Sequence, residues 1–223
     1  MRHVRGVWRG VRRGDRVGWG MKILHAFADE GVESEALAPH GHITRVGLDP
    51  QGTPHTDATL AVDLTEVEIS KLFTHDFDLG LFHPPCYKWT QRDAEDAENL
   101  IPLARKIARE YCDEWIIENQ PNAPLHNPTI LKGEMFGLPV AYERAFETSY
   151  PVEQPSFRGS YNYRHRVENE HAKSYWGAIK GYNHELYDRL MLITNSTPRP
   201  YINWLLQPLL HEGARPETQQ STL

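Results

Sequence analysis

Residues 78–119 read DLGLFHPPCYKWTQRDAEDAENLIPLARKIAREYCDEWIIEN, and this stretch decides the fold class. Asp78–Phe82 is a short apolar run that ends in a turn, which is typical of a buried strand. Asp93–Cys112 carries apolar residues at steps of three and four, the spacing of an amphipathic helix, at Leu100, Leu103, Ile107 and Tyr111. Glu114–Ile117 is a second apolar run. The stretch therefore predicts a strand, a helix and another strand.

The same alternation extends toward the N-terminus. Met21–Phe27, Ile43–Leu48 and Leu60–Asp63 have the composition of short strands, and Glu33–Ala38 can form a short helix. Later in the chain, Tyr142–Phe146 and Tyr150–Val152 are candidates for further strands. Strands that alternate with helices predict an α/β fold with a mostly parallel sheet. Ligands of such sheets bind beyond the carboxyl ends of the strands. Chemically distinctive residues occur there after each predicted strand, namely Phe27, Asp49, Asp63, Cys86 and Glu118.

Cys86 follows a predicted buried strand and two prolines, Pro84 and Pro85. A cysteine held rigidly at a strand end can serve as an aimed nucleophile. The alternative is a buried structural cysteine. Glu118 ends the next apolar strand, where burial is expected to raise the pKa of its carboxyl group so that it can hold or donate a proton. The alternative for Glu118 is an ion pair with an arginine or a helix cap.

Together, PPC at residues 84–86 and ENQ at residues 118–120 resemble the motifs of the cytosine-5 DNA methyltransferase family. Their order and the single helix between them also match, and the resemblance is greatest to short, phage-type members. It covers Met21 to about Leu210. It implies a Rossmann-like S-adenosylmethionine-dependent methyltransferase fold with a reduced target-recognition region. Cys86 would attack a flipped-out cytosine, Glu118 would hold its N3, and Arg144 in YERAFE would contact its O2.

The resemblance also implies a site for S-adenosylmethionine. Leu24–Gly31 is similar to the family's first cofactor loop, although His25 replaces an acid, and Asp29 and Val32 replace glycines. Thr194–Leu205 is similar to its last motif. The expected cofactor-binding residues are Phe27, Asp29, Gly31, Asp49, Asp63, Pro84 and Asn195. For Asp49 and Asp63, an ordinary turn residue at a strand end is the alternative.

The domain organisation predicted from the sequence has a catalytic domain formed by residues 21–151 and 174–210. Residues 1–20 are an arginine-rich leader expected to be disordered, or to precede a true start at Met21, and residues 211–223 are a polar tail. Residues 152–173 are a small insertion that mixes cations with tyrosines, which suits contacts to DNA. Its expected DNA-binding residues are Arg158, Arg164, Arg166 and Lys173; a solvated loop is the alternative. So small an element predicts relaxed specificity or a partner subunit.

Composition restricts the other possibilities. The net charge is −6 although residues 1–20 contain six arginines and one acid, so the remainder is strongly acidic and DNA contacts must be local. Two cysteines and scattered histidines predict no disulfide framework and no metal site. No apolar run is long enough for a membrane span. A cytoplasmic location is expected, in the host cytoplasm if the chain is phage-encoded, with a role in restriction and modification.

Three other functions are compatible with the motifs. An amino methyltransferase would need Asp, Asn or Ser before the prolines, where this chain has His83. An enzyme acting on another pyrimidine substrate would also use a Pro-Cys nucleophile. A catalytically inactive DNA-binding or decoy protein of the same fold would explain the altered glycines of the first cofactor loop.

Overall fold

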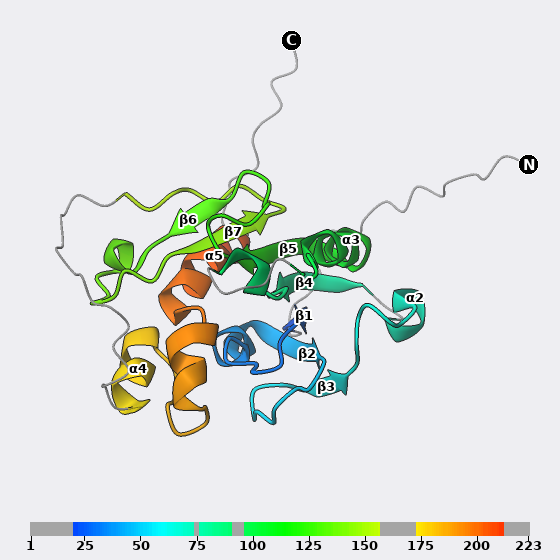
Figure 1. Ribbon diagram of the computed structural model, residues 1–223, viewed down its shortest axis with the longest axis horizontal. Helices are drawn as coiled ribbons and strands as arrows, with labels where there is room; N and C mark the ends of the chain where they lie inside the picture. Colours follow the sequence, from blue (N-terminus) through cyan, green and yellow to red (C-terminus); the bar gives the residue numbers. More distant parts are fainter. Residues whose placement is uncertain (1–19, 74–75, 91–95, 157–172, 212–223) are drawn as a thin grey trace, which may run out of the picture.

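The structure, a computed structural model, describes residues 20–73, 76–90, 96–156 and 173–211 (Figure 1). The described residues form one sheet whose seven strands have the spatial order β3-β2-β1-β4-β5-β7-β6. The strands are β1 (Met21–Ala26), β2 (Gly41–Gly47), β3 (Ala58–Ala61), β4 (Phe77–Phe82), β5 (Cys112–Asn119), β6 (Thr129–Leu131) and β7 (Arg144–Thr148). Strands β3, β2, β1, β4 and β5 are parallel, and β7 is antiparallel to both of its neighbours. The mostly parallel α/β sheet predicted from the sequence is confirmed.

Helices cover both faces of this sheet. They are α1 (Ser34–Leu37), α2 (Ile69–Leu72), α3 (Ile101–Tyr111), α4 (Lys173–Lys180) and α5 (Arg199–His211), with short turns of helix at η2 (Ala38–His40), η3 (Tyr87–Trp89), η4 (Gly133–Phe136) and η5 (Met191–Asn195). Successive strand residues point to opposite faces, so Ile23 packs with α1 and α5, whereas Leu24 packs with α3. Figure 1 shows α4 and α5 on the side of α1, away from α3.

The order of the strands creates the place for a site. From β1 the chain proceeds outward through β2 and β3, and it then returns to β4 on the other side of β1. The backbone N–H of His83, just after β4, donates to the carbonyl of Ala26 at 3.0 Å. The loops that leave β1 and β4 therefore diverge from one point, which is where open α/β sheets bind ligands.

Several predicted boundaries differ from the structure. Helix α3 begins at Ile101, later than the predicted Asp93, because Pro102 suits the first turn and the Asn99 side chain accepts the N–H of Ile101 at 3.1 Å. Strand β7, at Arg144–Thr148, begins and ends two residues later than the predicted strand 142–146. The predicted strand 150–152 is not part of the sheet, since Tyr150 lies in a bend and residues 151–152 have no regular secondary structure. Strand β6 was not predicted.

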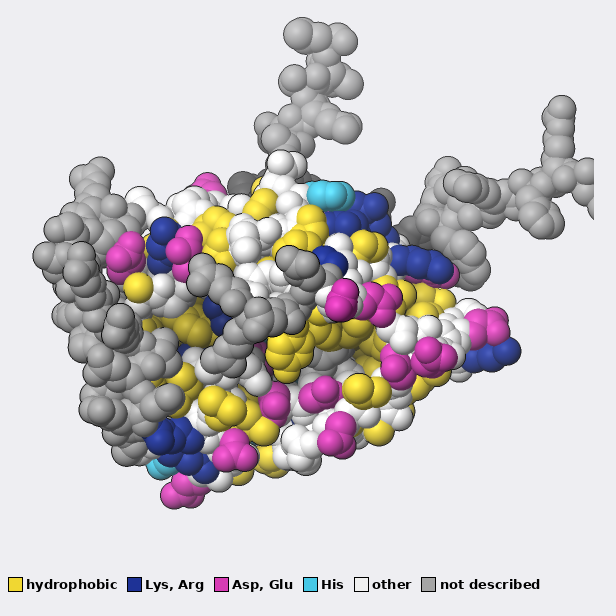
Figure 2. Space-filling view, viewed as in Figure 1, with side chains coloured by type: hydrophobic (Ala, Val, Ile, Leu, Met, Phe, Trp, Pro, Cys, Tyr) yellow, Lys and Arg dark blue, Asp and Glu magenta, His cyan; other side chains and the backbone are white. Residues whose placement is uncertain are grey.

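The surface of the described residues is unevenly charged. On the face shown in Figure 2, acidic side chains are spread over the lower half, and Lys and Arg form small groups near its edges. Among the described residues, no helix is both long and apolar enough to pass through a membrane.

Candidate active site

One cavity of about 210 Å³ lies where the β1 and β4 loops diverge. It is lined by eight of the residues that the sequence analysis assigned to catalysis and cofactor binding, namely Phe27, Asp29, Gly31, Pro84, Cys86, Glu118, Arg144 and Asn195. These residues come from β5, β7, the end of η5 and the loops after β1 and β4. The fold therefore brings together motifs that are far apart in the sequence.

The loop that carries Cys86 is tied to β5. The side-chain amide of Asn119 is buried and donates to the carbonyl of Pro84 at 2.9 Å. After Cys86 the chain turns into η3, where the Trp89 N–H donates to the Cys86 carbonyl at 2.9 Å. Cys86 is half-buried and lines the cavity. Its thiol is therefore both held and accessible, as a nucleophile requires.

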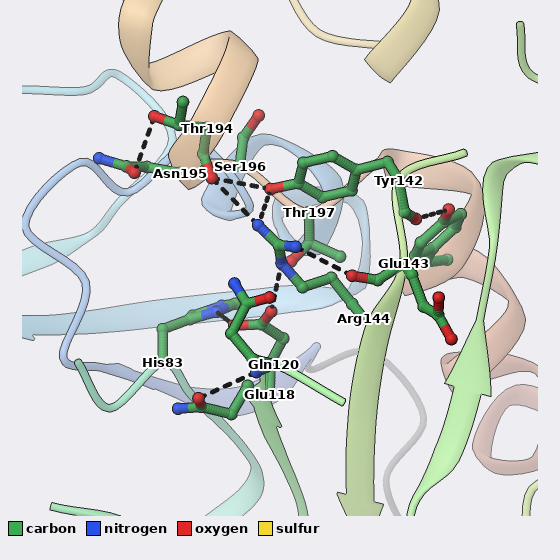
Figure 3. Close-up of polar contacts among 12 residues, drawn as sticks. His83, Glu118, Gln120, Tyr142, Glu143, Arg144, Thr194, Asn195, Ser196 and Thr197 are labelled. Atoms are coloured by element: carbon green, nitrogen blue, oxygen red, sulfur yellow. Dashed lines mark hydrogen bonds and ion pairs between the residues drawn. The ribbon is translucent and has the colours of Figure 1, made fainter. Parts of the chain in front are cut away.

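The two carboxylate oxygens of Glu118 each have one partner, Arg144 at Oε1 and His83 at Oε2 (Figure 3). Its Oε1 lies 2.9 Å from Arg144 Nε, and its Oε2 lies 3.2 Å from His83 Nδ1. The three side chains are almost fully enclosed, with 12 to 14% of each exposed. The carboxylate of Glu118 is thus fixed in orientation while remaining at the cavity wall.

Arg144 makes four further contacts on the side away from Glu118 (Figure 3). One Nη1 hydrogen is donated to the Glu143 carbonyl at 2.9 Å, and Nη2 donates to the Tyr142 hydroxyl and to the Thr194 carbonyl, the latter at 3.1 Å. The guanidinium also lies 3.9 Å from the centre of the Tyr142 ring. A guanidinium has five N–H donors, so among the described contacts one Nη1 hydrogen remains available for a ligand.

The electrostatics of the site correct one expectation. Burial does act to raise the pKa of Glu118, but the hydrogen bond from His83 and the charge of Arg144 reverse this and lower the pKa below its usual value. Glu118 is therefore a carboxylate at neutral pH, not a proton donor in its resting state. Burial acts to lower the pKa of Arg144, but Tyr142, Glu118 and Cys86 raise it. Arg144 thus places a permanent positive charge near the Cys86 thiol.

The loop after β1 forms the other half of the cavity. Phe27 has a positive φ of 55°, an uncommon backbone conformation for a residue with a side chain. Gly31 has φ of 62°, and a Cβ there would collide with the buried side chain of Arg45. Asp29 Oδ1 accepts the N–H of Asp49 at 3.0 Å, whereas Glu30 Oε2 is buried without a partner among the described residues. Glu30 is therefore the acid with a free oxygen for a cationic ligand group.

Two predicted cofactor residues lie outside this cavity. Among the described residues, neither Asp49 nor Asp63 is part of its lining. Asp49 is exposed and contributes its backbone N–H to Asp29. The Asp63 carboxylate accepts the N–H and the hydroxyl of Thr65 at 2.9 and 2.7 Å, as a turn residue does. Of the predicted DNA-binding residues, Lys173 begins α4, whereas Arg158, Arg164 and Arg166 lie outside the described residues.

The structure adds residues that the sequence analysis did not assign to the site. Tyr142 lies just before β7, and its hydroxyl donates to the Thr194 carbonyl at 2.8 Å. Lys180 is fully buried, and its Nζ donates to the carbonyls of Ile193 and Ser196 at 3.1 and 2.5 Å. Burial lowers the pKa of Lys180 well below its usual value, and the charge of Arg144 lowers it further. A lysine in the apolar segment YWGAIKGY was the available signal for Lys180.

No protein-family model matches the sequence, and a search of curated proteins finds no match. Among solved structures, the Entamoeba histolytica methyltransferase EhMeth superposes with a TM-score of 0.58, at 9% identity, over 88% of this chain and 99% of that one. DNMT2 of Spodoptera frugiperda gives a TM-score of 0.45 at 16% identity, over 69% and 61% of the two chains. The S. pombe Dnmt2 methyltransferase gives 0.45 at 15%, over 70% and 63%.

This chain therefore spans less than two thirds of the length of the two Dnmt2 structures. At these identities the likenesses concern the fold alone, and of these three superpositions the one with EhMeth has a TM-score above 0.5. Together with the strand order, it shows that the chain has the Rossmann-like fold of S-adenosylmethionine-dependent methyltransferases.

Proposed function

We propose that this chain transfers a methyl group from S-adenosylmethionine to carbon 5 of a cytosine in DNA, through a covalent bond between the cytosine and Cys86. The observation that carries the proposal is the convergence of Cys86, Glu118 and Arg144 on one cavity, beside the loop Phe27–Gly31. The fold and the motifs at its strand ends support the same reaction.

Carbon 5 of cytosine is too weak a nucleophile to accept a methyl group unaided. The Cys86 thiolate adds to carbon 6, which places electron density on carbon 5. The guanidinium of Arg144 lines the same cavity as Cys86 and offers its remaining Nη1 hydrogen to the cytosine O2, where negative charge develops. After carbon 5 has bonded to the transferred methyl group, a base takes the proton from carbon 5. The electron pair of that C–H bond re-forms the double bond between carbons 5 and 6, and the Cys86 sulfur leaves.

Glu118 orients the base during these steps. Because His83 and Arg144 each occupy one of its oxygens, the carboxylate cannot rotate away from the cavity. Each carboxylate oxygen accepts more than one hydrogen bond, so Glu118 still accepts from the exocyclic amine of cytosine and from N3 once that nitrogen is protonated. The pyrimidine edge is thus read by one acceptor and one donor, Glu118 and Arg144.

The residues after β1 fit S-adenosylmethionine, which supplies an electrophilic methyl group on a sulfonium when bound. Phe27 and Gly31 both line the cavity, where Phe27 offers an aromatic face. The unpartnered Oε2 of Glu30 can accept from an ammonium group. Asn195, the last residue of η5, lines the same cavity.

A base inside a duplex must leave the stack to reach a cavity of this kind. The acidic side chains seen in Figure 2 require the DNA contacts to be local. Lys173, at the start of α4, and the arginines of residues 152–173 remain the proposed contacts. Replacing one phosphate contact should weaken binding to all DNA sequences and lower the slope of the salt dependence by about 1.

The reaction is tested by incubating the full chain with S-adenosylmethionine labelled in its methyl group and with equal amounts of DNA and RNA. Digestion to nucleosides should place the label in 5-methyldeoxycytidine. Label in methyladenosine or N4-methylcytosine would refute the covalent mechanism, and label in RNA alone would refute DNA as the substrate.

A second measurement isolates the covalent step. DNA containing 5-fluorocytosine cannot lose a proton from carbon 5, so it should remain bonded to Cys86 after denaturation. Peptide mapping identifies the modified cysteine, and Cys112 is the internal control because it lies on β5, away from the cavity lining. No adduct, together with cofactor binding and no transfer to any nucleic acid, would favour the inactive DNA-binding protein.

A further inference from the structure

Two histidines and one glutamate point ligand atoms toward one another beside the cavity. The ligand atoms of His25, Glu33 and His83 all lie within 4.8 Å of one another. His25 is on β1, Glu33 precedes α1 and His83 follows β4, so three separate segments supply the cluster. The two imidazole rings meet edge to face with their centres 5.2 Å apart, and His25 Nε2 lies 3.9 Å from Glu33 Oε2.

Each of these three side chains is oriented by a hydrogen bond at the polar atom that faces away from the cluster. The bonds join His25 Nδ1 to Ser34 Oγ at 2.8 Å, His83 Nδ1 to Glu118 Oε2 at 3.2 Å and Glu33 Oε1 to the Thr197 N–H at 2.6 Å. Histidines that bind metal ions in proteins are commonly held in this way, with the second ring nitrogen bonded to a carboxylate or another polar group.

The remaining ring nitrogens have nothing to bind. Within the described part of the chain, Nε2 of His25 and Nε2 of His83 are both buried without a hydrogen-bond partner. A carboxylate only accepts hydrogen bonds, so Nδ1 of His83 carries a proton. Two buried ring nitrogens without partners are a costly arrangement in a protein interior. A metal ion bound between them would satisfy both nitrogens.

We propose that His25, Glu33 and His83 bind one divalent transition-metal ion. Two imidazoles and one carboxylate are a donor set that suits Zn²⁺, whose bonds to such ligands are about 2.0–2.2 Å long. The ligand atoms must therefore draw together by roughly 1 Å on binding. Glu33 and His83 also line the cavity, so the metal site lies at its wall. The metal site does not depend on the methyl-transfer reaction proposed above.

The probe is Zn²⁺ added to the full chain after treatment with a chelator. After removal of free metal, mass spectrometry should find about one ion per chain, and the melting temperature should rise because only the folded chain has the site. When Co²⁺ is bound in place of Zn²⁺, the protein should show visible absorption bands typical of nitrogen and oxygen ligands.

Three substitutions separate metal binding from folding. His25→Ala removes a ligand, and Glu33→Gln removes the charge while its amide oxygen still accepts the Thr197 N–H. Both should weaken Zn²⁺ binding by about 100-fold or more, because loss of an outer partner alone costs about 10- to 100-fold. Ser34→Ala removes only the partner of His25 and should weaken binding by about 10-fold.

The control is His42→Ala, an exposed histidine on β2 whose side chain is 66% exposed. It should bind Zn²⁺ as the unchanged chain does. Absence of Zn²⁺ uptake by the unchanged chain, or full uptake by Glu33→Gln in a folded state confirmed by circular dichroism, would overturn the proposal. Loss of Zn²⁺ binding in His42→Ala would also overturn the proposal.

Discussion

The amide of Asn119 donates to the carbonyl of Pro84 at 2.9 Å, and this one buried hydrogen bond joins the two motifs of the site. Asn119 is the last residue of β5, next to Glu118, and Pro84 lies two residues before Cys86. Neighbouring parallel strands place these loops side by side, but the hydrogen bond fixes the distance between the nucleophile and the carboxylate.

Asn119→Ala should therefore impair catalysis more than cofactor binding. The Pro84 carbonyl would lose its donor and the loop would shift, and a displacement of about 1 Å at a reacting group can cost roughly 100-fold in rate. We expect kcat for methyl transfer to fall by about 10- to 100-fold, while the Kd for S-adenosylmethionine, measured by calorimetry, changes little.

The matched control is Asn122→Ala. The Asn122 amide also donates to this loop, to the Trp89 carbonyl at 3.0 Å, but it is exposed and water can replace it. Its kcat should stay close to that of the unchanged chain. Equal losses in both variants would mean that any contact to the loop matters, and that the bond between Asn119 and Pro84 has no special role.

Cys86→Ser should lower methyl transfer by at least about 1,000-fold, which corresponds to roughly 4 kcal/mol of activation free energy. A serine hydroxyl is a much weaker nucleophile than a cysteine sulfur unless a neighbouring base activates it. Cofactor affinity should be unchanged because the loop after β1 is untouched. Cys112→Ser is the control and should retain activity. Substantial transfer by Cys86→Ser would be incompatible with a covalent intermediate.

The strand ends and the motifs on them were predictable because both signals are local. An apolar run that stops at PPC or EN shows in the sequence itself, and a parallel sheet places such ends at one edge. The antiparallel β7 and the short β6 were not predictable to the same extent, because three residues such as Thr129–Leu131 carry little pattern.

The chemistry of Glu118 depended on partners that no local spacing reveals. His83 and Arg144 approach it from two other elements, and together they reverse the effect of burial on its pKa. The cluster of His25, Glu33 and His83 is a similar case. Histidines on separate strands lack the short ligand spacings by which metal sites are recognised in a sequence, so only the strand order brings them together.

Gly31→Ala should destabilise the chain and weaken cofactor binding. Gly31 has φ of 62°, and an added Cβ would lie 2.8 Å from Arg45 Cδ, inside normal contact distance. Arg45 is fully buried and cannot move aside. We expect the free energy of unfolding, from urea titration, to fall by about 2 kcal/mol or more. Gly52→Ala is the control, since a Cβ there meets nothing within 4 Å, and its stability should change by less than about 0.5 kcal/mol.

The ion pair between Arg105 and Glu147 should make stability depend on acid pH. Arg105 on α3 donates from Nε and Nη2 to the two oxygens of Glu147 on β7, at 2.8 and 2.7 Å. Burial acts to raise the pKa of Glu147, but the bonds from Arg105 and the His126 N–H lower it below its usual value. A carboxyl group with a lowered pKa stabilises the folded state above the pKa of the unfolded chain, and this contribution is lost as the pH falls through the folded pKa.

Glu147→Gln should therefore cost about 3 kcal/mol of unfolding free energy at pH 7, the size expected when one partner of a buried pair is removed. The difference from the unchanged chain should persist down to about pH 5 and shrink below about pH 4, as Glu147 becomes protonated in the unchanged chain as well. Urea titrations at several pH values measure it. Glu68→Gln, which removes an exposed partner of Lys71, should have little effect at any pH. A difference for Glu147→Gln that stayed constant to pH 3 would show that its effect comes from packing and not from charge.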